Sequence, residues 1–96
     1  MRPSVVLVAK RDQVIAIAAA RGVRVVRVCG SVARGGDRED SDIDLSIDMP
    51  PGTSPVLVVG LRFDIEDASG ARVDLCTERE REPALRRRIL AEARTL

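Results

Sequence analysis

Three aspartates in the sequence are spaced so that they could hold a divalent cation. Asp42 and Asp44 are two residues apart in the segment DIDLSID, where apolar and polar residues alternate as in a half-buried strand. Their side chains should therefore leave the same face of that strand, about 7 Å apart along it. Asp74 lies between Val73 and Leu75 in a second alternating segment, where a carboxylate is disfavoured unless something nearby binds it. If the two strands are neighbours, the three carboxylates meet.

The ligand types available in the chain select a hard cation. Clustered carboxylates repel one another until a cation neutralises them. The sequence has no histidine, and its two cysteines, Cys29 and Cys76, lack CxxC spacing, so we expect thiols beside the core rather than a redox pair or a zinc site. Oxygen ligands alone favour two Mg²⁺ ions, with Mn²⁺ as the alternative. Such a pair, about 3.5 to 4 Å apart, would activate an attacking hydroxyl and stabilise departing pyrophosphate.

A phosphate-binding turn is expected directly after the first strand. Gly30 permits close approach of a ligand, and Ser31 adds a hydroxyl donor to the backbone N–H groups of a turn or helix start. Arg34 would lie on the same side of such a turn as Ser31 and could reach a phosphate oxygen. A surface salt bridge from Arg34 to Asp37 or Glu39 is an equally good interpretation.

Composition excludes several classes of function. With 96 residues the chain should form one domain over residues 1–96, and 16 Lys+Arg against 15 Asp+Glu create no field toward a polyanion or an anionic membrane. The single aromatic residue, Phe63, which we expect in the core, cannot build a base-stacking surface, so direct nucleic-acid binding is not expected. The lack of histidine removes serine–histidine triads. No apolar stretch approaches the roughly 20 residues of a membrane span, and no signal-peptide cleavage site is present, so we expect a soluble, cytoplasmic protein.

We expect an α/β (α+β) fold, in which a small mixed β-sheet flanked by helices positions these residues. In the strand over residues 42–48, Ile43, Leu45 and Ile47 should face the core, and the aspartates and Ser46 should face solvent. Asp40, which precedes this strand, should also face solvent. The first helix could begin as early as Ser4, because Val5 to Val8 suit either a helix or a strand. We expect helices over residues 10–21, 55–69 and from 82 onward, strands over 23–29, 42–48 and 71–76, and a loop after residue 29 that could start with one helical turn.

The segment GSVARGGDREDSDIDL resembles the signature of the minimal nucleotidyltransferases of the DNA polymerase β superfamily, and VDLCTERE resembles their third acidic strand. The chain length and the closing helix ILAEARTL also resemble the MNT antitoxins that are paired with HEPN ribonuclease toxins. The resemblance implies a polymerase β-like core in which Gly30 and Ser31 hold a triphosphate and Asp42 and Asp44 bind both metals. It implies that Asp74 is the third ligand and helps to deprotonate the acceptor.

The same resemblance implies an activity and a partner. We expect a Mg²⁺-dependent protein adenylyltransferase that acts as an antitoxin by moving AMP from ATP to a hydroxyl, in this family a tyrosine, of a HEPN-type toxin. A chain of this length has no room for a further acceptor-binding region, which favours a protein partner. Two alternatives remain: a non-catalytic antitoxin that neutralises the toxin by binding, and a small-molecule nucleotidyltransferase. Self-association is left open.

Overall fold

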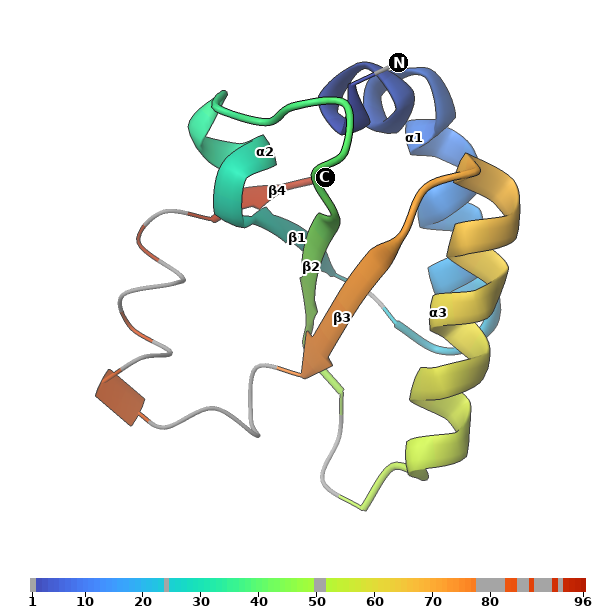
Figure 1. The fold of residues 1–96 in the computed structure, drawn as a ribbon. Helices are drawn as coiled ribbons and strands as arrows, with labels where there is room; N and C mark the ends of the chain where they lie inside the picture. Colours follow the sequence, from blue (N-terminus) through green and yellow to red (C-terminus); the bar gives the residue numbers. More distant parts are fainter. Residues whose placement is uncertain are drawn as a thin grey trace.

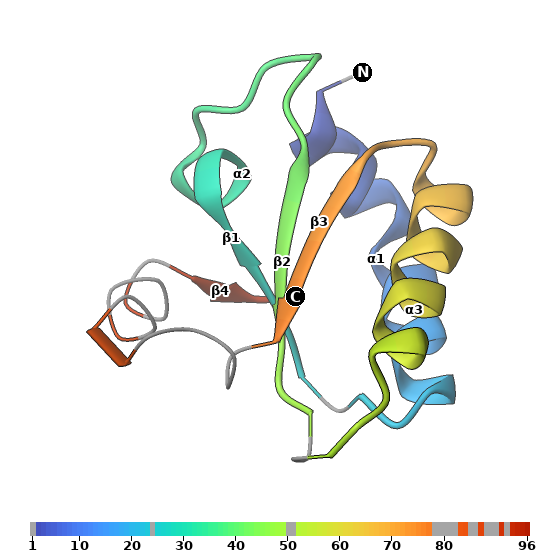
Figure 2. The ribbon, with the colours of Figure 1, turned by 60° about the horizontal axis from the view of Figure 1, so that its bottom comes forward.

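A computed structural model of the chain shows a mixed four-stranded sheet that carries Asp44 and Asp74. The structure describes residues 2–23, 25–49, 52–77, 83–84, 87, 91 and 93–96. In chain order the elements are α1 (Pro3–Ala20), β1 (Val26–Cys29), α2 (Gly30–Arg34), β2 (Ile43–Ile47), α3 (Pro55–Ser69), β3 (Val73–Thr77) and β4 (Arg94–Thr95). The long helices α1 and α3 lie side by side against one side of the sheet, and α2 stands at the end of β1 (Figures 1 and 2).

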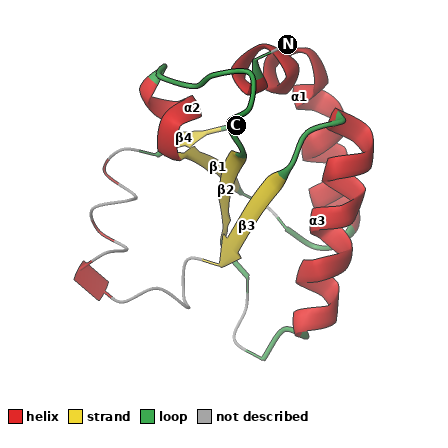
Figure 3. Ribbon diagram, viewed as in Figure 1, coloured by secondary structure: helices red, strands yellow, loops and turns green. Residues whose placement is uncertain are grey.

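The strand order explains how the two acidic segments become neighbours. The order is β3-β2-β1-β4, with β1 antiparallel to both β2 and β4, and β2 parallel to β3. Parallel neighbours require a crossover connection, and α3 supplies it between β2 and β3 (Figure 3). The expected small mixed sheet flanked by helices is confirmed.

One face of this sheet forms the hydrophobic core. Ile43, Leu45 and Ile47 of β2 are at most 1% exposed, as the alternation in the sequence predicts. Burial of an aliphatic side chain of this size stabilises the fold by about 1.5 to 3 kcal/mol. The fully buried helix residues of the same cluster are Val14, Ala18, Leu61 and Ile65.

The structure resolves the start of the first helix in favour of the longer interpretation. Pro3 occupies the first helical turn, where its fixed φ and missing N–H cost nothing. Leu7, Val14 and Ala18 are buried along one stripe of α1, so packing holds the valine-rich first turns in a helix despite their strand propensity.

The central helix α3 was predicted with its observed bounds, because its end signals are local. The Ser54 hydroxyl accepts a hydrogen bond from the N–H of Val56 at 3.2 Å, which caps the first turn beside Pro55. Gly70 ends the helix in the left-handed region with φ of 70°, and its N–H donates to the Glu66 carbonyl at 2.8 Å.

Three expectations about burial and strands are wrong. Phe63 is 54% exposed, because Leu61 and Ile65 define the buried stripe of α3 and residue 63 falls outside it; the Arg62 guanidinium lies 5.6 Å from its ring centre. Ser46 is fully buried although it lies on the face expected to be solvated. The first strand begins at Val26, not at residue 23.

The end of the chain also departs from the expectation. The helix expected from residue 82 falls largely outside the described residues, but its expected end does not. Arg94 and Thr95 form an edge strand paired with Val28 and Arg27, and the Leu96 N–H donates to the Val26 carbonyl at 2.9 Å. The pairing partner of these residues lies far away in the sequence, so no local pattern indicates it. Within the described part of the chain, no helix combines the length and apolarity that crossing a bilayer requires.

Candidate functional site

The strand register brings two of the three aspartates together. Asp44 of β2 is directly opposite Asp74 of β3 in the parallel ladder. Paired residues on strands about 4.8 Å apart point to the same face, here the face opposite Ile43 and Leu45. Asp44 is half-buried and Asp74 is exposed. Asp42 immediately precedes β2 and is exposed, and strand alternation gives it the same side as Asp44.

Gly30 is the residue that gives the Asp44 carboxylate its room. It begins α2 with φ of 66°, a left-handed conformation that side chains disfavour. A Cβ built at this position would collide with Oδ2 of Asp44. The backbone start of α2 therefore lies directly against the carboxylate of β2, which requires both the conformation and the absence of a side chain.

The other two residues of the expected phosphate turn lie on α2. The predicted helical turn after the first strand is present, with Ser31 half-buried and Arg34 exposed in its last turn. The first N–H groups of a helix lack acceptors within it and attract anions. Gly30, Ser31 and the Asp44 carboxylate thus lie next to one another at the end of β1.

The carboxylates do not form a ready-made metal cluster. Among the described residues, no three His, Cys, Asp or Glu side chains lie close enough to hold a metal ion together. Asp42 instead forms an ion pair with Arg72, in which Nε lies 3.1 Å from Oδ1. The donor set still fits a hard divalent cation, because it consists of carboxylate oxygens on one face of neighbouring strands.

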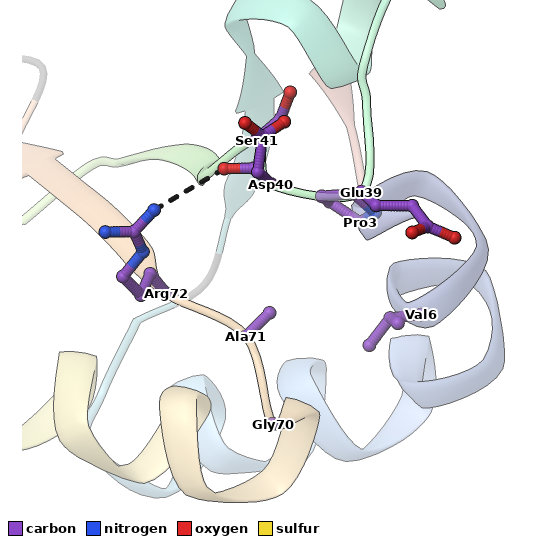
Figure 4. A pocket seen from close by; sticks show the side chains of 8 residues that line it. All are labelled: Pro3, Val6, Glu39, Asp40, Ser41, Gly70, Ala71 and Arg72. Carbon is purple, nitrogen blue, oxygen red and sulfur yellow. Dashed lines mark hydrogen bonds between the residues drawn. The ribbon is translucent and has the colours of Figure 1, made fainter. Parts of the chain in front are cut away.

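Arg72 contacts the predicted site but belongs to none of the motifs that predict it. It precedes β3, and its Nη2 donates to the Asp40 carbonyl at 3.4 Å (Figure 4). A cavity of about 350 Å³ lies beside it, between α1, the segment before β2 and the start of β3. The strand alternation that selected Asp74 also places Arg72, two residues earlier, on the same face, and that signal could have identified it.

Two cysteines that form no disulfide flank the acidic pair. Cys29 is buried opposite Asp44 in the antiparallel ladder, as expected for a thiol beside the core. Cys76 is only half-buried, and its Sγ lies 3.8 Å from Oδ1 of Asp74, to which the thiol can donate.

Asp37 fixes the segment between α2 and β2 to the first helix. Its Oδ2 accepts a hydrogen bond from the Ser4 N–H at 2.8 Å, and its Oδ1 lies 3.4 Å from Nη2 of Arg2. The Ser4 N–H, with a smaller contribution from the Arg2 charge, lowers the pKa of Asp37 below its ordinary value of 3.8. The sequence gives no signal for this contact, because 33 residues separate Ser4 from Asp37.

Comparison with known proteins identifies the family. Residues 11–96 match the nucleotidyltransferase domain family. The chain belongs to this family. It is 42% identical to a solved structure described as a minimal nucleotidyltransferase, an assignment that is itself provisional, with a TM-score of 0.85 over 94% of this chain and 92% of the other. The resemblance to the minimal nucleotidyltransferases is thereby confirmed, and the chain is an enzyme of this type.

Two further relatives of this nucleotidyltransferase carry functional names. A Methanocaldococcus jannaschii protein, provisionally named a protein adenylyltransferase, is 36% identical over 83 residues, which cover 86% of this chain and 89% of that protein. The protein adenylyltransferase MntA of Thermococcus cleftensis is 34% identical over 71 residues, covering 74% and 72%.

Two toxin–antitoxin complexes share the fold of this nucleotidyltransferase at lower identity. A complex with AMP-PNP aligns at 17% identity and a TM-score of 0.77, over 88% of this chain and 69% of the other. A complex of a tri-AMPylated HEPN toxin from Shewanella oneidensis with its MNT antitoxin aligns at 15% identity and a TM-score of 0.70, over 91% and 68%. At these identities the likeness concerns the fold.

Proposed function

We propose that this nucleotidyltransferase is an antitoxin that transfers AMP from ATP to a tyrosine hydroxyl of a HEPN-type toxin. The names of its relatives and the modified toxin bound to a protein of the same fold support this proposal. The observation that carries it is the direct pairing of Asp44 with Asp74. The Asp44 carboxylate also lies so close to Gly30 that residue 30 could not carry a side chain in this conformation.

The start of α2 would hold the triphosphate. The N–H groups at Gly30 and Ser31 and the Ser31 hydroxyl would donate to phosphate oxygens. Arg34, exposed on the last turn of α2, would add a charged donor. These contacts would hold the α-phosphate near the carboxylates of β2 and β3.

Asp42, Asp44 and Asp74 would hold Mg²⁺, with Mn²⁺ as the substitute. When bound, such ions polarise the phosphate and neutralise the charge that develops on the leaving group. In the transfer, the tyrosine oxygen forms a bond to the α-phosphorus while the bond to the bridging β-phosphate oxygen breaks and pyrophosphate leaves. Asp74, the most outward of the paired carboxylates, would accept the proton of the attacking hydroxyl.

The test is transfer of labelled AMP to the toxin encoded beside this protein. Asp44→Asn should abolish labelling with Mg²⁺ and ATP, and Asp48→Asn, an exposed aspartate just beyond the same strand, should retain it. Toxin neutralisation that persists in Asp44→Asn without label would support an antitoxin that acts by binding alone. Label on a small molecule without any toxin present would support the small-molecule nucleotidyltransferase.

A further inference from the structure

Arg72 forms an ion pair with Asp42, which immediately precedes β2. Its Nε lies 3.1 Å from Oδ1 of Asp42, while its Nη2 reaches the Asp40 carbonyl at 3.4 Å. The guanidinium thus holds Asp42 and also, through the Asp40 carbonyl, the segment that leads into β2. Figure 4 shows the second of these contacts. In the same structure, the described acidic side chains do not gather into a group that could hold a metal. Asp42 is therefore paired with Arg72 and is not part of any such group among the described residues.

We infer that Arg72 competes with the divalent cation for Asp42 and so disfavours binding of the cation without nucleotide. A carboxylate whose charge is already neutralised by a guanidinium attracts a second cation less, and a guanidinium nearby repels that cation directly. This inference rests on the proposed function, because it assumes that Asp42 is one of the ligands.

The ion pair between Arg72 and Asp42 is weak enough for a cation to displace Arg72. The Arg72 side chain is 77% exposed and that of Asp42 is 48% exposed. Exposed pairs of this kind change an equilibrium by about fivefold or less. Arg72 therefore weakens cation binding without preventing it, and the triphosphate charge that arrives with the nucleotide can offset the loss.

Binding order is the functional consequence. Without nucleotide, the site holds Asp42 in an ion pair and binds free cation weakly. With nucleotide, the added negative charge favours the cation, and Asp42 can leave Arg72 to join Asp44 and Asp74. Arg72 is therefore a positioning residue that acts through Asp42.

The test measures Mn²⁺ binding to the whole protein by the loss of the electron paramagnetic resonance signal of free Mn²⁺. Without nucleotide, Arg72→Gln should bind Mn²⁺ about two- to fivefold more tightly than the wild type. Arg62→Gln, which removes the same charge from the outer surface of α3, should match the wild type. Arg72→Lys should stay close to the wild type, because it retains the charge. A non-hydrolysable ATP analogue binds Mn²⁺ itself, so binding in its presence is measured against a protein-free sample of the analogue. Beyond that reference, the difference between Arg72→Gln and the wild type should shrink.

The outcomes separate this inference from the proposed function. Unchanged or weaker Mn²⁺ binding in Arg72→Gln, with normal binding in the wild type, overturns the competition but leaves the transferase intact. Tighter binding in Arg72→Gln together with no AMP transfer to the toxin supports the competition and overturns the proposed activity. Absence of Mn²⁺ binding by every variant, both without nucleotide and beyond the binding of the analogue alone, contradicts both.

Discussion

The two faces of the sheet use the same strands for opposite purposes. On the face covered by α1 and α3, Ile43, Leu45 and Ile47 are at most 1% exposed and belong to the hydrophobic core cluster. On the other face, the alternate residue Asp44 is half-buried and paired with the exposed Asp74. A period of two allows one strand to supply both the core and the carboxylates.

Substitutions on the covered face should therefore change stability, and substitutions on the acidic face should change the chemistry. The covered face is closely packed, so loss of volume there costs folding free energy. The acidic face holds like charges close together, so removal of one charge should leave the fold intact or slightly favoured. The substitutions below test this separation.

The largest effect is expected at Asp74. Asp74→Asn should lower the rate of AMP transfer about a thousandfold, because it removes a ligand and the acceptor of the hydroxyl proton. Its midpoint of thermal unfolding should not fall. Asp67→Asn, which removes the same charge from the exposed surface of α3, should transfer AMP normally. Equal rates in the two variants would show that the acidic face has no part in the chemistry.

The next largest effect is expected in the core. Leu61→Ala should reduce the free energy of unfolding by about 2 to 5 kcal/mol in urea titrations, because it leaves a cavity at a position that is 0% exposed. Val59→Ala, on the exposed side of α3, should change it by less than about 0.5 kcal/mol. The fraction of Leu61→Ala that remains folded should keep its transfer rate. A similar cost for both variants would mean that α3 does not pack as described.

Gly30 connects the two kinds of effect, and Gly35 provides a matched control. Both residues have positive φ, so alanine at either position should cost about 1 to 2 kcal/mol of stability. Only at residue 30 would the new Cβ collide with the Asp44 carboxylate; at residue 35 it would meet open space. Gly30→Ala should therefore transfer AMP at least about tenfold more slowly than Gly35→Ala under conditions where both are folded. If the two rates agree, the closeness of Gly30 to Asp44 has no catalytic role.

The smallest effect is expected from the Asp37 contact. Because the folded state lowers the pKa of Asp37 below 3.8, its charged form stabilises the protein above that pH. This contribution should disappear as the pH falls from 3.8 through the lower, folded-state pKa. Asp37→Asn should therefore be less stable than the wild type at pH 7 in urea titrations, and the difference should shrink below about pH 4. Asp12→Asn removes the same charge at a side chain that is almost fully exposed, and its free energy of unfolding at pH 7 should match that of the wild type.

Local signals in the sequence account for most of the fold. Ser54, Pro55 and Gly70 fix both ends of α3, and the alternation around Asp44 predicts which side of β2 is buried. Contacts between segments that are distant in the sequence cannot be predicted from such local signals. The pairing of Arg94 and Thr95 with β1 depends on a partner that no local pattern specifies.

The candidate site shows the same division between local and distant information. The spacing of Asp42, Asp44 and Asp74 gives their common face, once β2 and β3 are neighbours. The ion pair of Asp42 with Arg72 was missed, because spacing gives the side of a strand on which a residue lies but not the direction of its side chain. Phe63 was assigned to the core from its type alone, and the position of the buried stripe overrides residue type.

The most direct test of the carboxylate site is a crystal structure of the protein with Mn²⁺ and a non-hydrolysable ATP analogue, read through the anomalous scattering of manganese. We expect a manganese peak coordinated by Asp44 and Asp74, with Asp42 released from Arg72 and the triphosphate at the start of α2. A manganese ion held by the nucleotide alone, or at carboxylates elsewhere on the surface, would contradict the account.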